Sequence, residues 1–361
     1  MKYLIVQDWN NTHGNHAGMV HMCKMLCERY PNEYEMYVKP NAKTFSKVPN
    51  GFIDKVLNKV YYRFVRMYYQ KVTYPNEYLK LCQPMFNKLK QGDEVFLLEY
   101  LIPWVSQLEL ARYLSDHFPY VRIYALSHLT TKFFIESIDN KENNTLKWAK
   151  FVDKMLTLGT SLSQYFETKG VAKNKISTGF HYVDDEYYHK LTPFENNTNK
   201  PLTIITMGAL QRDYTMLAKV VKACPQVHWI ICKGRKQIDY LFNELDNVEL
   251  KGFMPEVDLR TQMDRADISL NLMEDTVGSN VITTSMAMGL AMIVTDVGSI
   301  RDYCSEDNAL FCSNDSDSVI SAINYLNENR DYVLKMKKNS LGKSQMLHIN
   351  HINEWFCSLI G

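Results

Sequence analysis

A phosphate-binding pattern stands out in the second half of the chain. The stretch 274–302 reads EDTVGSNVITTSMAMGLAMIVTDVGSIRD, and Gly278, Ser279 and Asn280 come directly before a small-residue run that predicts a helix. Backbone N–H groups at a helix start have no partner inside the helix, and the helix dipole adds positive charge there. The amides from Gly278 to Val281 are therefore candidates for holding a phosphate group.

The residues that follow predict the sheet that would position this helix. Gly289 is expected to end the helix, and residues 291–294 form an apolar run typical of a parallel strand buried on both faces. The turn at 296–299 would leave the C-terminal end of that strand, where open α/β sheets bind their ligands. An α/β unit that binds no ligand has the same local pattern, so both interpretations stay open.

Two basic residues follow other predicted strands of the same region. Arg212 comes shortly after an apolar strand within 202–210, and Lys233 directly follows the strand 227–232. A guanidinium pairs with phosphate oxygens through two parallel hydrogen bonds, whereas an ammonium acts as a point charge. Both residues are candidate phosphate ligands, and the alternative for Arg212 is a surface salt bridge with Asp213.

The chain begins with a strand, a loop and a helix. Residues 2–6 predict a buried strand, 8–18 a polar loop and 19–30 a helix, which together form the first unit of a doubly wound sheet. The loop lacks the Gly-x-Gly-x-x-Gly pattern, and a dinucleotide site is therefore disfavoured.

The composition is that of a cytoplasmic globular protein. The 361 residues suffice for two domains, and 46% apolar with 22% charged residues are typical of a globular chain. A net charge of +1 argues against a general nucleic-acid binder. No apolar run reaches the roughly 18 residues of a membrane span, and the N-terminus is too short and too polar for a signal peptide. Eight cysteines without a CxxC pair predict a reducing compartment and no metal site.

The segment 41–90 is strongly basic. It has ten Lys/Arg and two acidic residues, a local charge of +8, and its part 51–72 has helical periodicity. Basic and apolar stripes on one helix suit an anionic lipid surface, where each basic residue contributes about 1 kcal/mol. The alternative is a helix that packs its apolar stripe on the core and leaves the basic face in solvent. The apolar stripe is Ile53, Val56, Leu57, Val60, Phe64 and Met67, and the predicted membrane contacts are Lys55, Lys59, Arg63 and Arg66.

The stretch 274–302 resembles the donor-site signature of GT-B glycosyltransferases, in particular retaining family four. Met286 to Gly289 resembles the Ala-Met-Ala-x-Gly helix of the family, and Asp296 to Ser299 resembles its Asp-x-Gly-Gly turn. The resemblance covers roughly residues 120–310, and the first 40 more weakly. The two glutamates of the family's Glu-x7-Glu pattern fall on Thr276 and Thr284. In the family the second glutamate binds the ribose, so Thr284 would lie near the ribose with a single hydroxyl.

The resemblance implies an α/β architecture with two Rossmann-like, doubly wound domains that face a cleft. The polar, breaker-rich stretch 192–200 is the best candidate for a linker. We therefore predict an acceptor-side domain over 1–191 and a nucleotide-sugar domain over 201–345. Residues 346–361 would form a terminal helix that crosses back to the first domain.

The resemblance also implies site residues in the first domain. In the family the loop after the first strand touches donor phosphate and acceptor, which makes Gly18 a donor-side candidate and Gly14 and His16 acceptor-side candidates. A histidine often follows the family's strand corresponding to 121–126 and faces the donor sugar, so His128 is the catalytic candidate. Glu99 ends the preceding strand and would also face the cleft, on the acceptor side.

The reaction implied is transfer of a sugar from a nucleoside-diphosphate donor to an acceptor hydroxyl. The acceptor would be a lipid-linked or glycan molecule, with peripheral membrane contact on the cytoplasmic face, no nucleic acid, no cofactor and no metal. Helix dipoles and basic residues would neutralise the leaving diphosphate. Two alternatives stay open: a non-catalytic GT-B partner of another transferase, which the two missing glutamates allow, and a nucleotide-sugar epimerase.

Overall fold

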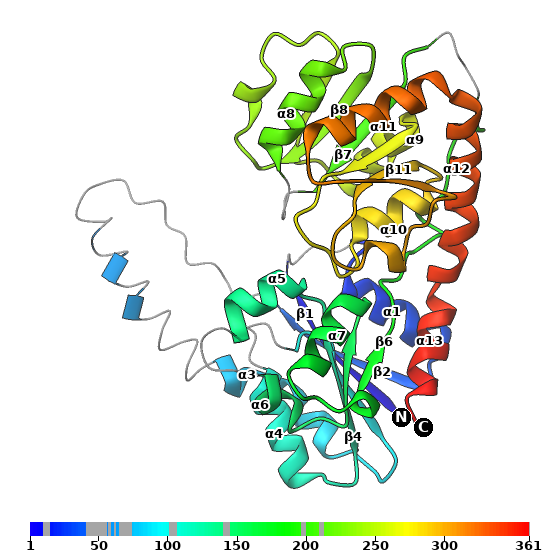
Figure 1. The fold of residues 1–361 in the computed structure, drawn as a ribbon. Coiled ribbons are helices and arrows are strands. Elements are labelled where there is room, and N and C mark those ends of the chain that lie inside the picture. The colour runs from blue at the N-terminus through cyan, green and yellow to red at the C-terminus, as the bar shows by residue number, and fades with distance from the viewer. Residues whose placement is uncertain are drawn as a thin grey trace. The chain divides into compact units, whose positions relative to one another are not determined.

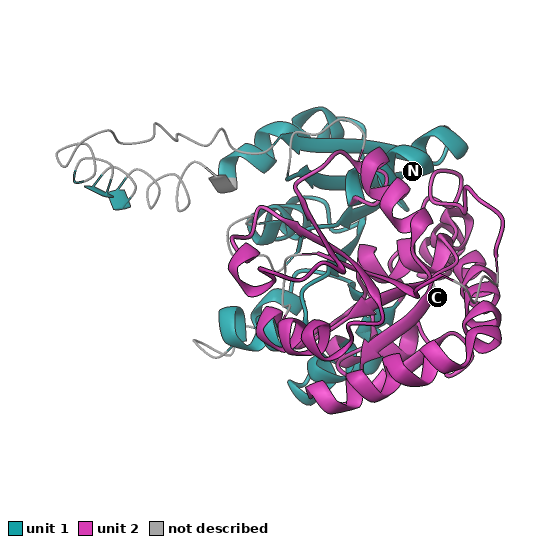
Figure 2. Cartoon of the chain, turned by 90° about the horizontal axis from the view of Figure 1, so that it is seen from above, with its two compact units in different colours: residues 1–13, 19–157, 163–178 teal, residues 14–18, 158–162, 179–361 magenta. Residues whose placement is uncertain are grey.

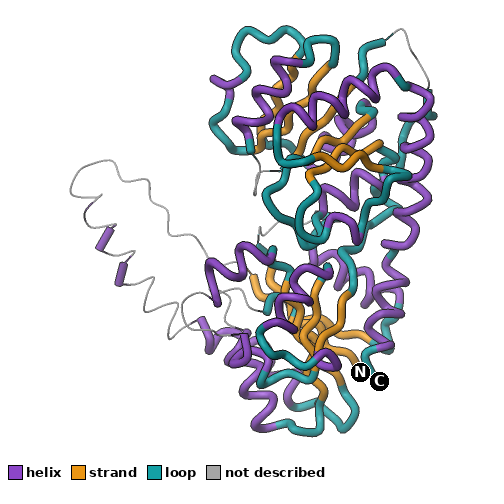
Figure 3. Tube along the Cα trace, in the orientation of Figure 1, coloured by secondary structure: helices purple, strands orange, loops and turns teal. Residues whose placement is uncertain are grey.

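The computed structural model (Figure 1) describes residues 1–9, 15–40, 56, 59–60, 63–64, 74–100, 107–139, 145–195, 200–208 and 213–360. The chain divides into two compact units. The first unit holds residues 1–13, 19–157 and 163–178, and the second holds 14–18, 158–162 and 179–361 (Figure 2). Each unit is built on one six-stranded sheet, drawn in orange in Figure 3.

The sheet of the first unit has the order β2-β1-β3-β4-β5-β6, and all neighbouring strands are parallel. Its strands are β1 (Lys2–Asp8), β2 (Tyr34–Pro40), β3 (Glu94–Leu97), β4 (Arg122–Ser127), β5 (Lys154–Thr157) and β6 (Ile176–Thr178). The helices around it are α1 (Met19–Arg29), α3 (Tyr74–Phe86), α4 (Gln107–His117), α5 (Thr131–Phe134), α6 (Thr145–Ala149) and most of α7 (Thr160–Thr168).

The sheet of the second unit has the order β12-β11-β10-β7-β8-β9 and is also entirely parallel. Its strands are β7 (Thr203–Met207), β8 (His228–Gly234), β9 (Val248–Gly252), β10 (Ile268–Asn271), β11 (Ala291–Thr295) and β12 (Ala309–Cys312). Its helices are α8 (Tyr214–Ala223), α9 (Glu256–Arg265), α10 (Asn280–Ala287), α11 (Ser316–Glu328), α12 (Arg330–Ser344) and α13 (Ile349–Ser358).

Helices cover both faces of the second sheet. Successive side chains of a strand point to opposite faces, and in β8 Trp229 and Ile230 belong to different core clusters. The Trp229 cluster includes residues of α8, α11 and α12, whereas the Ile230 cluster includes residues of α9 and α10. A parallel sheet buried on both faces explains why β11 is apolar and buried along its whole length.

The structure confirms the predicted α/β class and both doubly wound sheets. The strand that Glu99 was predicted to end is shorter than expected: β3 ends at Leu97, and Glu99 follows it. The elements without a counterpart in the sequence prediction include β2, α3, α5, α6, β6, α8, β12 and α12. The predicted terminal helix is α13, and it belongs to the second unit, as do residues 179–191.

Candidate functional site

The strand order of the second sheet reverses between β7 and β10, which are hydrogen-bonded neighbours. A helix begins after each of these strands: α8, which is capped by Asp213, and α10, which is capped by Ser279. Open α/β sheets bind ligands at this kind of position, because the two loops diverge there. Arg212 directly precedes the α8 cap in the sequence and lies outside the described residues.

The start of α10 has two amides available for an anion. The Ser279 hydroxyl accepts a hydrogen bond from the Val281 amide at 3.3 Å, and the Gly278 amide donates to the Thr276 hydroxyl at 3.3 Å. The amides of Ser279 and Asn280 donate to no residue in the described ranges. Of the four amides predicted to hold phosphate, two are therefore used within the loop and two remain.

Gly278 has a structural role in addition to the predicted one. Its φ of +111° lies in the region that favours glycine, and a Cβ there would come within 2.3 Å of the Tyr303 hydroxyl. That hydroxyl donates to the Leu158 carbonyl at 2.5 Å and accepts from the His181 amide at 2.8 Å. Tyr303 therefore fills the space above Gly278 and fixes the loop before α10.

His181 was not among the sequence candidates, although it lies beside the start of α10. Its Nδ1 is 3.0 Å from the Tyr182 carbonyl, and its ring is hydrogen-bonded to the Asn280 side chain. Burial lowers the pKa of His181, so the imidazole is neutral at pH 7. The sequence signal was weak, because a lone histidine between aromatic residues is typical of a buried core position.

The two threonines at the positions of the family glutamates use their hydroxyl groups within the protein. Thr276 accepts from Gly278, as described above, and the Thr284 hydroxyl donates to the Asn280 carbonyl at 2.6 Å. Thr284 is buried and retains only acceptor capacity toward a ligand. Neither threonine reproduces the two oriented oxygens of a carboxylate.

The turn after β11 is packed onto the loop after β10. The Ser299 amide donates to the Thr276 carbonyl at 2.7 Å, and the Thr276 amide donates to Asp275 Oδ1 at 2.8 Å. Gly298 has a φ of +54°, and a Cβ there would lie 2.3 Å from both Asp275 Oδ1 and the Thr276 carbonyl oxygen. The predicted glycine turn thus holds the loop that leads into α10.

Lys233 is paired within the protein. It lies near the C-terminal end of β8, and its ammonium contacts Asp239 Oδ2 at 2.7 Å and the Lys236 carbonyl at 3.3 Å. A phosphate would have to replace Asp239 in order to bind this ammonium. The role predicted for Lys233 therefore requires an exchange of ion-pair partners.

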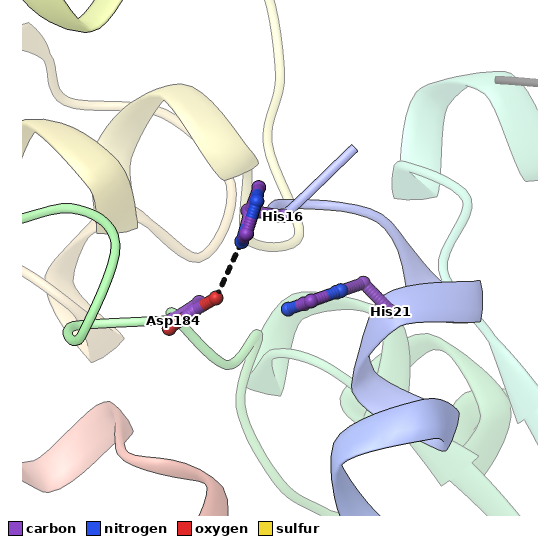
Figure 4. Close-up of side chains that lie close together, drawn as sticks. All are labelled: His16, His21 and Asp184. Carbon is purple, nitrogen blue, oxygen red and sulfur yellow. Dashed lines mark hydrogen bonds and ion pairs between the residues drawn. The ribbon is translucent and has the colours of Figure 1, made fainter. Parts of the chain in front are cut away.

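The loop before α1 contributes residues 15–18 to the second unit, whereas Gly14 lies outside the described residues. His16 Nδ1 is 2.7 Å from Asp184 Oδ2, as the dashed line in Figure 4 shows. Because a carboxylate only accepts, Nδ1 carries the proton of this bond. The His16 ring stacks on Tyr187 with centroids 3.7 Å apart. The Gly18 amide donates to the Asn15 carbonyl at 3.1 Å and is thus already bonded.

The structure brings Glu99 and His128 together in the first unit. Glu99 follows β3, His128 follows β4, and the distance from His128 Nε2 to Glu99 Oε2 is 3.3 Å. Only 1% of Glu99 is exposed, and burial raises the pKa of its carboxyl group to about 8, against a smaller lowering by a hydrogen bond from Trp9. The Glu99 amide donates to Gln107 at 2.9 Å, which fixes the backbone at this position.

This raised pKa makes stability depend on pH. Between pH about 4.5 and 8 the folded protein keeps a proton on Glu99 that the unfolded chain has released, so stability falls as pH rises through this window. Glu99→Gln removes the ionisation and retains the volume. The free energy of unfolding of the variant, relative to that of the wild type, should therefore increase by about 2–4 kcal/mol between pH 5 and pH 9.

The measurement is urea unfolding of both proteins at several pH values. Glu136→Gln, a change of an exposed glutamate of the same unit, serves as the matched control and should follow the wild type. Parallel pH profiles for the wild type and Glu99→Gln would contradict the assignment.

Part of the predicted membrane segment is described. Lys59 and Arg63 are helical and exposed, whereas Lys55 and Arg66 lie outside the described residues. Three members of the predicted apolar stripe are also exposed: Val56 by 48%, Val60 by 51% and Phe64 by 62%. The alternative in which this stripe packs on the core does not hold for these three residues. No helix in the described part of the chain is long and apolar enough to span a membrane.

Part of the chain matches a known family. Residues 201–329, which contain β7 to β12 and the starts of α8 and α10, match the family described as Glycosyl transferases group 1. No curated protein sequence matches the chain.

Solved structures with the same fold extend over the whole chain. HepE from Anabaena, in complex with UDP, is similar with a TM-score of 0.71 at 13% identity, covering 100% of this chain and 99% of that one. Sucrose-phosphate synthase from Thermosynechococcus elongatus has a TM-score of 0.67 at 14% identity, with coverage of 100% and 99%. A glycosyltransferase from Rickettsia africae has a TM-score of 0.64 at 13% identity, with coverage of 99% of each chain. These likenesses establish the GT-B fold, and the narrower assignment to family four stays a prediction.

Proposed function

We propose that this GT-B chain, which carries a group 1 glycosyl transferase domain over residues 201–329, transfers a sugar from a nucleoside-diphosphate donor to an acceptor hydroxyl. The observation that carries the proposal is the pair of helix starts, α8 and α10, on the two sides of the switch point in the second sheet. Negative charge develops on the leaving diphosphate during transfer, and helix N-termini stabilise such charge without any rearrangement.

The diphosphate would bind at the amides of Ser279 and Asn280, with Arg212 as a bidentate partner from the loop after β7. Asn280 has a second function here, because its side chain is held by the neutral His181 ring. A fixed Asn280 keeps the first turn of α10 in place when an anion binds. Thr284 would offer its hydroxyl oxygen to the ribose as an acceptor.

A uridine diphosphate sugar is the first donor to test. HepE has been solved with UDP, with UDP and glucose, and with UDP-glucose. The diphosphate of such a donor would meet the helix starts of α8 and α10. The transferred sugar and the acceptor are set by other residues. We assign His128 to the sugar, with Glu99 as the group that orients its ring.

The proposal is tested with a panel of UDP, GDP, ADP and CDP sugars. Thermal shift should show at least one donor that raises Tm by several degrees at about 1 mM, since a ligand that binds only the native state stabilises it. Incubation of that donor with acceptor glycolipids should then release the nucleoside diphosphate. A shift without release identifies the non-catalytic partner, which the internally bonded Thr276 and Thr284 favour. Isomerised donor without any acceptor identifies an epimerase, and no shift in the whole panel overturns donor binding.

We also propose that the basic segment binds an anionic membrane surface. The exposed stripe of Val56, Val60 and Phe64 lies at helical spacing, and the exposed cations Lys59 and Arg63 lie on the same turns. Apolar side chains that enter the headgroup boundary and cations that meet lipid phosphates give additive binding terms. This surface would bring the chain to a lipid-linked acceptor.

Vesicle sedimentation tests the membrane proposal. Binding to vesicles with 30% phosphatidylserine should exceed binding to pure phosphatidylcholine, and Phe64→Ser together with Arg63→Gln should reduce it about tenfold. Tyr240→Ser together with Arg235→Gln, a matched exposed aromatic–basic pair of the second unit, is the control. Equal binding of both double variants would contradict the role of this segment.

A further inference from the structure

A cavity of about 550 Å³ lies at the N-terminal ends of the strands of the second sheet, whereas α10 starts beyond their C-terminal ends. Thr203 and His228, the first residues of β7 and β8, line it, as does Asp267, which directly precedes β10. The strands are parallel, and the loops to α8 and α10 leave their other ends. The cavity and the candidate donor site therefore lie at opposite ends of the strands of one sheet and are separate from each other.

Two of the three carboxylates that line this cavity, Asp264 and Asp267, already have partners. Asp267 accepts from the Lys337 ammonium at 2.8 Å and from the Thr203 amide at 3.1 Å. Asp264 accepts from Lys190 at 3.0 Å and is bonded to the hydroxyl of Thr192 at 2.9 Å. These two acids are paired within the wall of the cavity, and the third carboxylate of its lining, Glu195, is exposed.

Arg330 has no carboxylate among its hydrogen-bond partners in the described part of the chain. It begins α12, and its guanidinium donates to neutral oxygens: the carbonyl and side-chain oxygens of Asn327, at 3.1 Å each, and the Lys200 carbonyl at 3.3 Å. Partial burial lowers the pKa of Arg330, and the negative charge of Asp267 opposes this effect. Arg265, on the same cavity, differs, because Glu249 binds it through two hydrogen bonds of 3.1 and 2.5 Å.

Lys200 places a second cation at the rim. Its carbonyl is bonded to Arg330, so the two residues are adjacent, and its side chain is exposed. Figure 1 shows the start of α12 at the end of the second unit where the chain enters β7. Both residues line the cavity, and guanidinium and ammonium groups are the side-chain groups that bind phosphate oxygens.

We propose that this cavity is a second ligand site, and that it binds a small phosphorylated metabolite through Arg330 and Lys200. The volume exceeds what a bare phosphate needs and lies within the range of small-molecule sites. Leu202, Val333 and Leu334 supply apolar walls for the carbon skeleton of the ligand. The site is independent of the proposed transferase function, because none of its residues belongs to the donor site.

Calorimetric titration with ribose 5-phosphate tests the proposal, with ribose and inorganic phosphate as comparison probes. We expect ribose 5-phosphate to bind at least tenfold more tightly than inorganic phosphate, and ribose to give no signal. Arg330→Gln should weaken the binding of ribose 5-phosphate about 10- to 100-fold, and Lys200→Gln should weaken this binding less. Arg265→Gln, the matched control on the same cavity, should leave the affinity within twofold.

Three results would overturn the proposal. One is the absence of binding at 10 mM, and another is equal weakening by Arg265→Gln and Arg330→Gln. The third is equal affinity for inorganic phosphate and ribose 5-phosphate, which would reduce the site to a simple anion site. Because the Arg330 side chain also bonds to backbone carbonyls, the Tm of Arg330→Gln is compared with that of the wild type. Lys200 is exposed, so Lys200→Gln provides a test that does not depend on folding. Ser279→Asp distinguishes the sites, since it should leave ribose 5-phosphate binding unchanged.

Discussion

Replacing Ser279 with aspartate is expected to weaken nucleoside-diphosphate binding at least 100-fold while the protein stays folded. Aspartate is as good an N-cap as serine, so the hydrogen bond to the Val281 amide is retained. The new carboxylate stands at the amides where we place the diphosphate. The carboxylate repels the diphosphate and occupies its place at the amides. This loss of binding free energy is far larger than the change in stability caused by exchanging the cap residue. The measurement is calorimetric titration with UDP, alongside the Tm of each protein.

The matched control exchanges the cap in the opposite sense on another helix. Asp315 caps α11 by accepting from the Ser318 amide at 2.8 Å, and α11 takes no part in the candidate site. Asp315→Ser should leave UDP affinity unchanged within twofold. Unaltered UDP affinity in Ser279→Asp would remove the start of α10 from the site.

Replacing Gly298 with alanine is expected to destabilise the protein by about 2–4 kcal/mol and to abolish transferase activity. Its φ of +54° disfavours any side chain, and the added Cβ would meet the Thr276 carbonyl at 2.3 Å and the Thr276 amide at 2.7 Å. Backbone atoms cannot rotate away as the end of a side chain can. The loop that leads into α10 would therefore have to move. Urea unfolding measures the loss of stability, and release of UDP from the donor measures activity.

Gly252→Ala is the control for this substitution. Gly252 ends β9, and a Cβ there would meet no atom within 4 Å. We expect stability equal to or slightly above that of wild type, because alanine restricts the unfolded chain. A Gly298→Ala protein as stable as Gly252→Ala would show that the turn after β11 does not support the site.

Buried parallel strands and capped helices were predictable from the sequence. The run 291–294 became β11, and the start predicted after Ser279 is the start of α10, because hydrophobic continuity and cap chemistry are local properties. The helix α12 was missed for the opposite reason. Its buried face contains Lys337 and Ser340, so apolar periodicity does not mark it.

The hydrogen-bond partners of the site residues were not predictable in the same way. Residue spacing in the sequence does not show which partner a side chain takes. Examples are the bond of Thr284 to its own helix, the ion pair of Asp239 with Lys233, and the contact of Tyr303 with Gly278. The meeting of Glu99 with His128 follows from two adjacent strand ends. It could have been expected once the order β3-β4 was known.

Hydrogen–deuterium exchange with and without a nucleoside diphosphate tests the central claim most directly. UDP, GDP, ADP and CDP are each added at saturation, and the exchange of every peptide is compared with that of the free protein. The account predicts that the diphosphate which binds protects peptides covering 274–284 and 208–214, while peptides of α12 are unchanged. Protection confined to other parts of the chain, or no protection with any of the four, would contradict a donor site at the start of α10.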